Sequence, residues 1–229
     1  NQILVENSRA CFSPICANFF GNPAKKLKLI GLTGTNGKTT TTFLIKQILE
    51  NVGKKVGLIG TVQNMIGDEI YPAKYTTPDP YELQKLFAMM VEAQCEYCVM
   101  EVSSQALAQG RVNGLRFAVG AFTNLTQDHL DYHKTWENYF NAKRILFENS
   151  DIAVTNADDE NGLKIVEGLD FDKLITYAVN TNNASYIAKN VSFKASGVEY
   201  ELVGDTIGRC YCPIPGRFSV YNSLCAAAT

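Results

Sequence analysis

The sequence predicts an α/β fold: a mostly parallel sheet with helices on both faces, plus a small antiparallel β addition. Three observations carry this. Short apolar runs alternate with segments whose apolar residues recur at helical spacing. Such alternation is typical of buried parallel strands joined by helices. A glycine-rich loop joins one apolar run to a helical segment, and 46% of the 229 residues are hydrophobic, enough for a sizeable core.

The elements follow in chain order. Residues 1–26 predict a short helix and a loop, and "LKLIGLTG" predicts the first buried strand. A helix from Lys38 to Asn51 ends near Gly53. Then come a strand in "KVGLIGT", a helix after "TTPDP", strands in "YCVMEVSS" and "FAVGAFTNL", a Thr-capped helix in "TWENYFNAKRILFEN", and a strand in "DIAVTNA".

The pattern changes after Leu174. The segments "LITYAV", "YIAKNVSF", "GVEYELV" and "GRCYCPI" have strand character, with Gly and Asn turns between them. They predict an antiparallel addition to the main sheet. A last helix begins in "FSVYNSLCAAAT" and the sequence stops inside it, and there is no initiator Met, so we expect a fragment of a longer protein.

Composition excludes several classes of protein. The net charge is −2 with no run of five like charges, which predicts no nucleic-acid partner and no anionic membrane surface. No apolar run approaches the ~20 residues of a membrane span, and the first residues lack the layout of a signal peptide. An odd count of seven cysteines is typical of reduced thiols, so we expect a cytoplasmic protein.

Two cysteine pairs leave alternatives open. Cys95 and Cys98 have the spacing of a redox motif, and Cys210 with Cys212 could add metal ligands. The better interpretation of "CEYCVMEV" is a strand entering the core, in which cysteine acts as a small hydrophobic residue.

The stretch "GLTGTNGKTTTTFL" predicts a phosphate-binding loop that leads into a helix. The general motif G-x-x-x-x-G-K-[ST] asks for glycine where Leu32 stands. Gly34 and Gly37 let backbone N–H groups turn towards an anion, which the helix N-terminus also attracts. Lys38 can reach terminal phosphates, and the Thr39 hydroxyl can bind Mg²⁺. The alternative is a glycine-rich turn that caps a helix.

Further polar residues follow the ends of predicted strands, where ligands of open α/β sheets bind. These are Glu101, Ser103, Ser104, Asn124, Asp128 and His129, and Thr76 and Thr77 precede the second long helix. Beside a phosphate loop, Glu101 is better explained as a metal or phosphate contact than as one half of a surface ion pair. His129 and His133 have a spacing that binds zinc on a helix, but the helix is predicted to begin later, at Thr135.

Several motifs, taken in order, resemble one family. They are T-G-T-N-G-K-T, "YTTPDP", "MEVSSQAL", "TNLTQDHLDYH", "NYFNAKRILF", "NADDENG" and "PGRFSVYNSLCAAA". The sequence is similar in these to the Mur ligases, most of all to the MurE branch, over nearly its whole length. The loop of that family does not require the first glycine.

The resemblance implies a domain plan and an activity. Residues 27–229 resemble the central ATP-binding domain, and residues 1–26 resemble the tail of the N-terminal domain that holds the uridine nucleotide. The C-terminal domain that selects the amino acid is absent, so we expect this stretch alone not to ligate. The implied enzyme is an ATP- and Mg²⁺-dependent amide ligase in cytoplasmic peptidoglycan synthesis, and a monomer. It adds L-lysine or meso-diaminopimelate to UDP-MurNAc-L-Ala-D-Glu through an acyl phosphate.

The resemblance also implies site residues. The nucleotide residues are Gly34, Thr35, Asn36, Gly37, Lys38, Thr39 and Thr40, with Asn222 near the adenine. The metal ligands are Thr39, Glu101, His129 and Lys143, the last as a carbamate. Lys38, Glu101, His129 and Lys143 form the catalytic set. The residues that contact the muramoyl-peptide substrate are Thr76, Thr77, Ser103, Gln109 and Arg111.

Two departures from the branch stand out, and two alternatives remain. Gln105 replaces the usual histidine in "EVSSHAL", and Ser219 replaces a common asparagine in "GRFNVxN". One alternative is another ligase of Mur type, a folylpolyglutamate or cyanophycin synthetase. The other is a non-catalytic nucleotide-binding module, since a fold does not fix a function.

Overall fold

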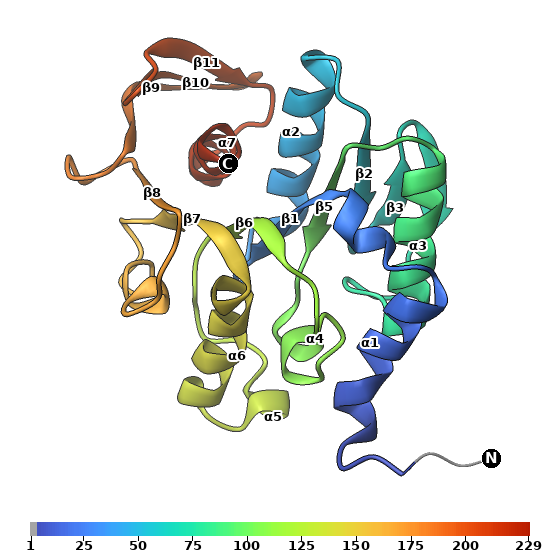
Figure 1. Ribbon diagram of the computed structural model, residues 1–229. Helices are drawn as coiled ribbons and strands as arrows, with labels where there is room; N and C mark the ends of the chain where they lie inside the picture. Colours follow the sequence, from blue (N-terminus) through green and yellow to red (C-terminus); the bar gives the residue numbers. More distant parts are fainter. Residues whose placement is uncertain (1–3) are drawn as a thin grey trace.

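The computed structural model describes residues 4–229 (Figure 1), so the first three residues of the predicted N-terminal tail lie outside the described part. The helices are α1 (Ser8–Phe19), α2 (Lys38–Asn51), α3 (Pro80–Glu92), α4 (Ser104–Ala108), α5 (Leu130–His133), α6 (Trp136–Glu148) and α7 (Arg217–Ala228), with 3-10 helices η1 (Pro23–Lys26) and η2 (Lys164–Val166). The strands are β1 (Lys28–Thr33), β2 (Val56–Ile59), β3 (Gln63–Ile66), β4 (Glu69–Pro72), β5 (Tyr97–Glu101), β6 (Phe117–Phe122), β7 (Ser150–Asn156), β8 (Lys173–Ala178), β9 (Tyr186–Lys194), β10 (Gly197–Val203) and β11 (Gly208–Cys212).

All strands join one sheet in the order β11-β10-β9-β8-β7-β6-β1-β5-β2-β3-β4. The central strands, from β9 to β2, pair in parallel. Both edges are antiparallel: β9, β10 and β11 on one side, and β2, β3 and β4 on the other. The predicted fold class, a mostly parallel sheet with an antiparallel addition, is therefore confirmed.

Two details of the predicted sheet are wrong. The antiparallel addition does not begin after Leu174, because β8 runs parallel to β7 and β9. The connection through η2 brings the chain back to the same end of the sheet, as a parallel pair requires. The hairpin of β3 and β4 is missing from the prediction, since each strand has only four residues and shows little periodicity.

Helices cover both faces of the sheet (Figure 1), and each face has its own apolar cluster. One cluster joins the sheet to α3 and α6 and includes Phe87, Phe117 and Phe147. The other joins it to α2 and α7 through Ile45 and Leu224. The central strands are buried on both sides, which explains why their sequences are nearly continuous apolar runs.

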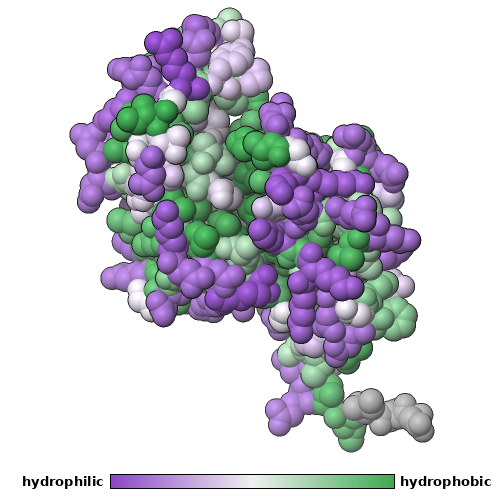
Figure 2. Space-filling view, turned by 45° about the horizontal axis from the view of Figure 1, so that its top comes forward, coloured by the Kyte–Doolittle hydropathy of each residue, from purple (hydrophilic) through white to green (hydrophobic). Residues whose placement is uncertain are grey.

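Helix α1 packs against α3, and the Ser13 hydroxyl donates to the carbonyl of Asn113 at 2.7 Å. Its outer side exposes Phe12, Ile15 and Phe19. Figure 2 shows apolar surface at the lower end of the view, where the chain begins. Among residues 4–229, no helix has both the length and the apolar character that crossing a membrane demands.

Candidate nucleotide site

The glycine loop begins where β1 ends. Leu32, at the position of the missing motif glycine, is still part of β1 and is fully buried. Gly34 (φ +144°) and Gly37 (φ +87°) have backbone conformations that side chains rarely allow. A Cβ atom on Gly34 would lie 2.0 Å from the Thr123 Oγ1 atom. The loop therefore needs glycine at positions 34 and 37, whereas the first motif position, Leu32, belongs to the strand.

The segment after β6 holds the loop from one side. The N–H of Thr35 donates to the carbonyl of Asn124 at 2.8 Å, and the N–H of Asn36 donates to the Asn124 side chain at 3.0 Å. The carbonyl of Asn36 accepts from the Asn124 amide at 3.0 Å and from the Thr123 hydroxyl at 2.7 Å. Four hydrogen bonds thus fix the loop residues between the two glycines.

Lys38, the first residue of α2, folds its side chain back over the loop. Its Nζ donates to the carbonyls of Gly34 at 2.8 Å and Thr35 at 3.0 Å. Burial lowers the pKa of Lys38, and the carboxylates of Glu101 and Asp128 oppose that shift. The ammonium therefore lies at the hollow that the loop surrounds, where an anion would stabilise its charge.

Glu101 ends β5 as a carboxylate that is only 1% exposed. The Thr39 hydroxyl lies 3.0 Å from both of its oxygens. Thr61 donates to it from its N–H at 2.8 Å and from its hydroxyl at 3.1 Å. The sequence prediction missed Thr61, although it follows the end of β2, the parallel neighbour of β5.

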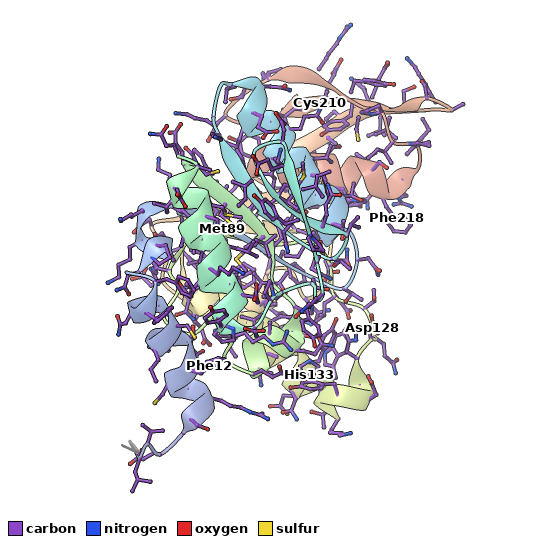
Figure 3. The ribbon with its side chains drawn as sticks, turned by 90° about the vertical axis from the view of Figure 1, so that its right-hand side faces the viewer. Phe12, Met89, Asp128, His133, Cys210 and Phe218 are labelled. Atoms are coloured by element: carbon purple, nitrogen blue, oxygen red, sulfur yellow. The ribbon has the colours of Figure 1, made fainter. Side chains whose placement is uncertain are left out.

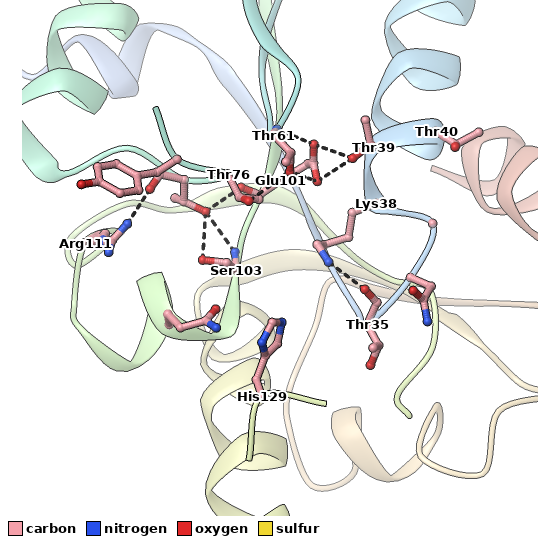
Figure 4. A pocket seen from close by; sticks show the side chains of 15 residues that line it. Thr35, Lys38, Thr39, Thr40, Thr61, Thr76, Glu101, Ser103, Arg111 and His129 are labelled. Atoms are coloured by element: carbon pink, nitrogen blue, oxygen red, sulfur yellow. Dashed lines mark hydrogen bonds between the residues drawn. The ribbon is translucent and has the colours of Figure 1, made fainter. Parts of the chain in front are cut away.

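These residues line one cavity of about 510 Å³ at the carboxyl ends of the strands (Figure 4). Its walls hold Thr35, Asn36, Gly37, Lys38, Thr39, Thr40, Thr61, Tyr75, Thr76, Thr77, Glu101, Ser103, Gln105, Arg111 and His129. Most of the predicted site residues are therefore brought together. Gly34, Gln109, Lys143 and Asn222 do not line this cavity.

Gln109 supports Arg111 at the far wall of the cavity. Its Oε1 accepts from Arg111 Nε at 2.9 Å and from Nη2 at 2.7 Å, while its amide donates to the Tyr132 hydroxyl at 3.0 Å. Arg111 also donates to the carbonyl of Thr77 at 2.7 Å and lies over the Tyr75 ring at 5.4 Å. In this arrangement Gln109 orients the guanidinium from behind.

Lys143 projects from α6 towards the underside of the loop and is 1% exposed. Its Nζ donates to the carbonyl of Gly34 at 2.9 Å and lies 4.7 Å from the centre of the Tyr139 ring. Burial holds the pKa of Lys143 well below its ordinary value, and the charge of Lys38 lowers it further. Both effects favour the unprotonated form of the amine, and the charge of Asp128 opposes them.

The two histidines point to different places. His129 has a left-handed backbone (φ +54°) and lines the cavity, with Asp128 Oδ2 3.6 Å from its Nε2. His133 is buried, with its Nε2 2.9 Å from the Ser104 hydroxyl, and burial lowers its pKa. In residues 4–229 no group of three His, Cys, Asp or Glu side chains could hold a metal, so the zinc alternative is wrong.

The cysteines also lack a shared site. All seven lie within the described range and are free thiols. Cys95 and Cys98 are buried in the core, as the preferred interpretation predicts, and burial raises the pKa of both thiols. Figure 3 places Cys210 far from His133, among the antiparallel strands at the other end of the molecule.

A second cavity of about 280 Å³ adjoins the loop, and Asn36 lines both. Asn222, on α7, lines this second cavity, and its Oδ1 would lie 2.3 Å from a Cβ on Gly37. The exposed ring of Phe218 and the carboxylate of Asp158 are also in the wall. An amide, an aromatic ring and a carboxylate beside a glycine loop are suited to a planar heterocycle.

The residues present fit a divalent cation at one place. Mg²⁺ takes oxygen ligands, and the Glu101 carboxylate faces the Thr39 hydroxyl at the floor of the larger cavity. Lys143 offers an amine directed at a backbone carbonyl, so its unmodified side chain adds no oxygen ligand.

A glycine loop between a buried parallel strand and a helix, with a lysine, a threonine and a buried carboxylate around one cavity, defines a phosphate-loop nucleotide-binding domain. The model of the Mur ligase middle domain matches residues 32–229. The chain belongs to the Mur ligase family.

Known proteins similar to this chain are ligases. It is 48% identical over 99% of its length to UDP-N-acetylmuramoyl-L-alanyl-D-glutamate--2,6-diaminopimelate ligase 1 of Clostridium acetobutylicum, and covers 47% of that protein. The corresponding ligase of Bacillus velezensis is 44% identical over 99% of this chain and is 48% covered. A solved structure of such a ligase superposes with a TM-score of 0.86 at 27% identity, covering 99% of this chain and 49% of the other.

The chain spans about half the length of the curated relatives it matches. MurF from Acinetobacter baumannii (TM-score 0.73) and the folylpolyglutamate synthase of Mycobacterium tuberculosis (0.72) share the fold, at 17% and 16% identity.

Proposed function

We propose that this chain is the ATP-binding part of a ligase that joins diaminopimelate to UDP-MurNAc-L-Ala-D-Glu in the cytoplasm, acting as a monomer. The observation that carries the proposal is 48% identity over 99% of the chain to a relative with that name, together with one cavity that holds the loop, Lys38, Thr39 and Glu101. The domain division is part of the proposal: residues 1–26 end a uridine-nucleotide domain, and residues 27–229 form the central domain.

The loop would bind the phosphates of ATP. The N-terminus of α2, which follows the loop, forms an anion site, and Lys38 is close enough to exchange its two carbonyl partners for phosphate oxygens. Asn222 would contact the adenine in the adjoining cavity. Charge on the transferring phosphoryl group develops where Lys38 can stabilise it.

The two substrates supply the nucleophiles, so no protein nucleophile is needed. The terminal carboxylate of the muramoyl dipeptide attacks the γ-phosphorus, the bond to the β–γ bridging oxygen breaks, and ADP leaves. The amine of diaminopimelate then attacks the acyl phosphate; the carbonyl–oxygen bond breaks, phosphate leaves and the amine loses a proton. Arg111, held by Gln109, and the hydroxyls of Thr76 and Ser103 would orient the carboxylate that reacts.

His129 at the cavity wall would be a ligand of a second metal ion, and Mg²⁺ would be held by Thr39 and Glu101. When bound, it supplies positive charge beside the phosphates. The protein residues do the rest: Thr61 holds the Glu101 carboxylate in place through two hydrogen bonds.

Lys143 would act as a carbamate. Carbamylation joins an unprotonated amine to CO₂ with loss of a proton, and burial together with Lys38 favours the unprotonated amine. The product would replace a cation under Gly34 with an anionic oxygen group next to the phosphate site.

A panel of acceptors tests the proposed function. The full-length protein would be given Mg-ATP, UDP-MurNAc-L-Ala-D-Glu or a folate, and diaminopimelate, lysine or glutamate, while phosphate release and product mass are measured. We expect turnover only with the muramoyl dipeptide and diaminopimelate. Turnover with lysine would correct the amino acid, turnover with a folate would make the protein a folylpolyglutamate synthetase, and ATP binding without turnover would make it a non-catalytic module.

A further inference from the structure

Tyr139 is a polar residue in an apolar place. It lies on α6, is 0% exposed, and belongs to the apolar cluster between the sheet and α3 and α6. A phenol hydroxyl in such a position needs a hydrogen-bond partner. Its partner is the hydroxyl of Thr35 in the glycine loop, with the two oxygens 3.0 Å apart. An internal helix residue therefore reaches the loop itself.

The surrounding hydrogen bonds determine which group donates. The N–H of Thr126 donates to the Thr35 hydroxyl oxygen at 3.0 Å, and that hydroxyl donates to the carbonyl of Thr126 at 3.2 Å. The one proton of Thr35 is then used, while a lone pair remains. Tyr139 is therefore the donor, and its hydroxyl completes the set of bonds at Thr35.

The ring of Tyr139 meets a second group of the same site. Lys143 lies four residues further along α6, on the same side of the helix, with its Nζ 4.7 Å from the ring centre. The same amine donates to the carbonyl of Gly34. Tyr139 thus contacts the loop through its hydroxyl and the Lys143 amine through its ring.

We propose that Tyr139 is a positioning residue for nucleotide binding, which holds the loop in its binding conformation through the Thr35 hydroxyl. The proposal rests on the proposed function in one respect, that the loop binds the phosphates of ATP. Gly34 and Gly37 on either side permit other conformations of the loop, and the Tyr139 hydroxyl adds a hydrogen bond to those from Thr123 and Asn124 that fix its middle. Fixing it beforehand lowers the entropy lost when nucleotide binds.

The main test compares Tyr139→Phe with Tyr200→Phe in the full-length protein. Tyr139→Phe keeps the ring and removes the hydroxyl, so we expect Mg-ATP to bind about 2- to 12-fold more weakly, as the loss of one hydrogen bond gives. Tyr200 is an equally buried tyrosine (2% exposed) on β10, and its variant is expected to bind as the wild type does. Wild-type affinity in Tyr139→Phe would overturn the proposal.

A double-mutant cycle separates positioning from a general loosening of the fold. Thr35→Val removes the hydroxyl that accepts from Tyr139. If the tyrosine acts through Thr35, adding Tyr139→Phe to Thr35→Val causes no further loss of affinity. An undiminished 2- to 12-fold loss in the Thr35→Val background would contradict the proposed route, whatever the melting temperatures of the variants.

A third variant tests the contact between the Tyr139 ring and Lys143. Tyr139→Leu removes the hydroxyl and the surface under Lys143, so we expect kcat to fall in addition to the weaker ATP binding of Tyr139→Phe. Equal kcat in the Leu and Phe variants would restrict the role of Tyr139 to Thr35. The binding measurements need no acceptor substrate. If the protein binds Mg-ATP but ligates no acceptor, the proposed function is overturned, and the Mg-ATP affinities of Tyr139→Phe and Tyr200→Phe still test the role of Tyr139.

Discussion

Replacement of Lys38 by alanine removes the cation that faces the nucleotide hollow. Its Nζ makes two hydrogen bonds, to the carbonyls of Gly34 and Thr35 at 2.8 and 3.0 Å. In the nucleotide complex we expect these to be replaced by phosphate contacts. A hydrogen bond to a charged group contributes about 1.5–3 kcal/mol, which corresponds to about 10- to 150-fold in Mg-ATP affinity. Because charge develops on the transferring group, we expect kcat to fall by about 10²- to 10³-fold.

The fold should tolerate the same change. The loss of two hydrogen bonds lowers the free energy of unfolding. Removal of a buried ammonium, whose pKa is lowered by burial, raises it, so the two effects oppose each other. We therefore expect a melting temperature within a few degrees of the wild type. Calorimetry with Mg-ATP and a phosphate-release assay on the full-length protein measure the two effects, with Lys54→Ala, at an exposed surface ion pair, as the control. Near-normal turnover in Lys38→Ala would refute the phosphate-loop assignment.

Four further predictions concern the residues around the loop. Glu101→Gln should weaken the apparent Mg²⁺ affinity at least about 10-fold, measured by Mg²⁺ titration of phosphate release; an unchanged titration would remove Glu101 from the metal site. Lys143→Ala should be inactive and partly restored by a short carboxylic acid such as acetate, and an active variant would contradict the carbamate. Gln105→His should keep the turnover number, since the hydrogen bonds of the Glu101 carboxylate come from Thr39 and Thr61 and do not involve Gln105; a large loss in kcat would show that the position is tuned to its substrate. Asp158→Asn should lower the melting temperature at neutral pH but lose less stability on acidification. Burial alone would raise the pKa of Asp158, but three backbone N–H donors and a tyrosine hydroxyl outweigh it and lower that pKa. The stabilisation by this carboxylate is thus present above its ordinary pKa of 3.8 and is lost as the pH falls through the lowered value. Equal acid sensitivity of both proteins in thermal unfolding would contradict the assignment.

The sequence predicted the candidate site best where a chemical motif directly follows a recognisable strand. The loop and the end of β5 could be predicted to meet, because parallel strands end at one edge of a sheet. Thr61 shares that edge but lacks a motif of its own. The contact between Tyr139 and Thr35 joins residues 104 positions apart, which no local pattern reveals. The direction of the Gln109 side chain, towards Arg111 rather than the cavity, depends on tertiary packing in the same way.

The strand pattern had similar limits. The apolar runs of β1 and β5 predict buried parallel strands, because a strand that is covered on both faces needs apolar residues at nearly every position. The four-residue strands β3 and β4 are too short for a period to appear, and the direction of β8 is decided by the path of the preceding connection. Spacing alone also suggested a shared role for His129 and His133, whereas His129 lines the cavity and His133 lies at hydrogen-bond distance from the Ser104 hydroxyl.

One carbonyl oxygen, that of Gly34, accepts from two lysines, Lys38 at 2.8 Å and Lys143 at 2.9 Å. A carbonyl dipole cannot neutralise two ammonium charges, and beside burial the charge of Lys38 lowers the pKa of Lys143. The loop therefore carries positive charge that no anionic group of the loop neutralises, and a bound anion would neutralise it. A polyphosphate that enters it should raise the pKa of Lys38 and so keep its ammonium charged. Added sulfate should compete with the nucleotide for the same charge.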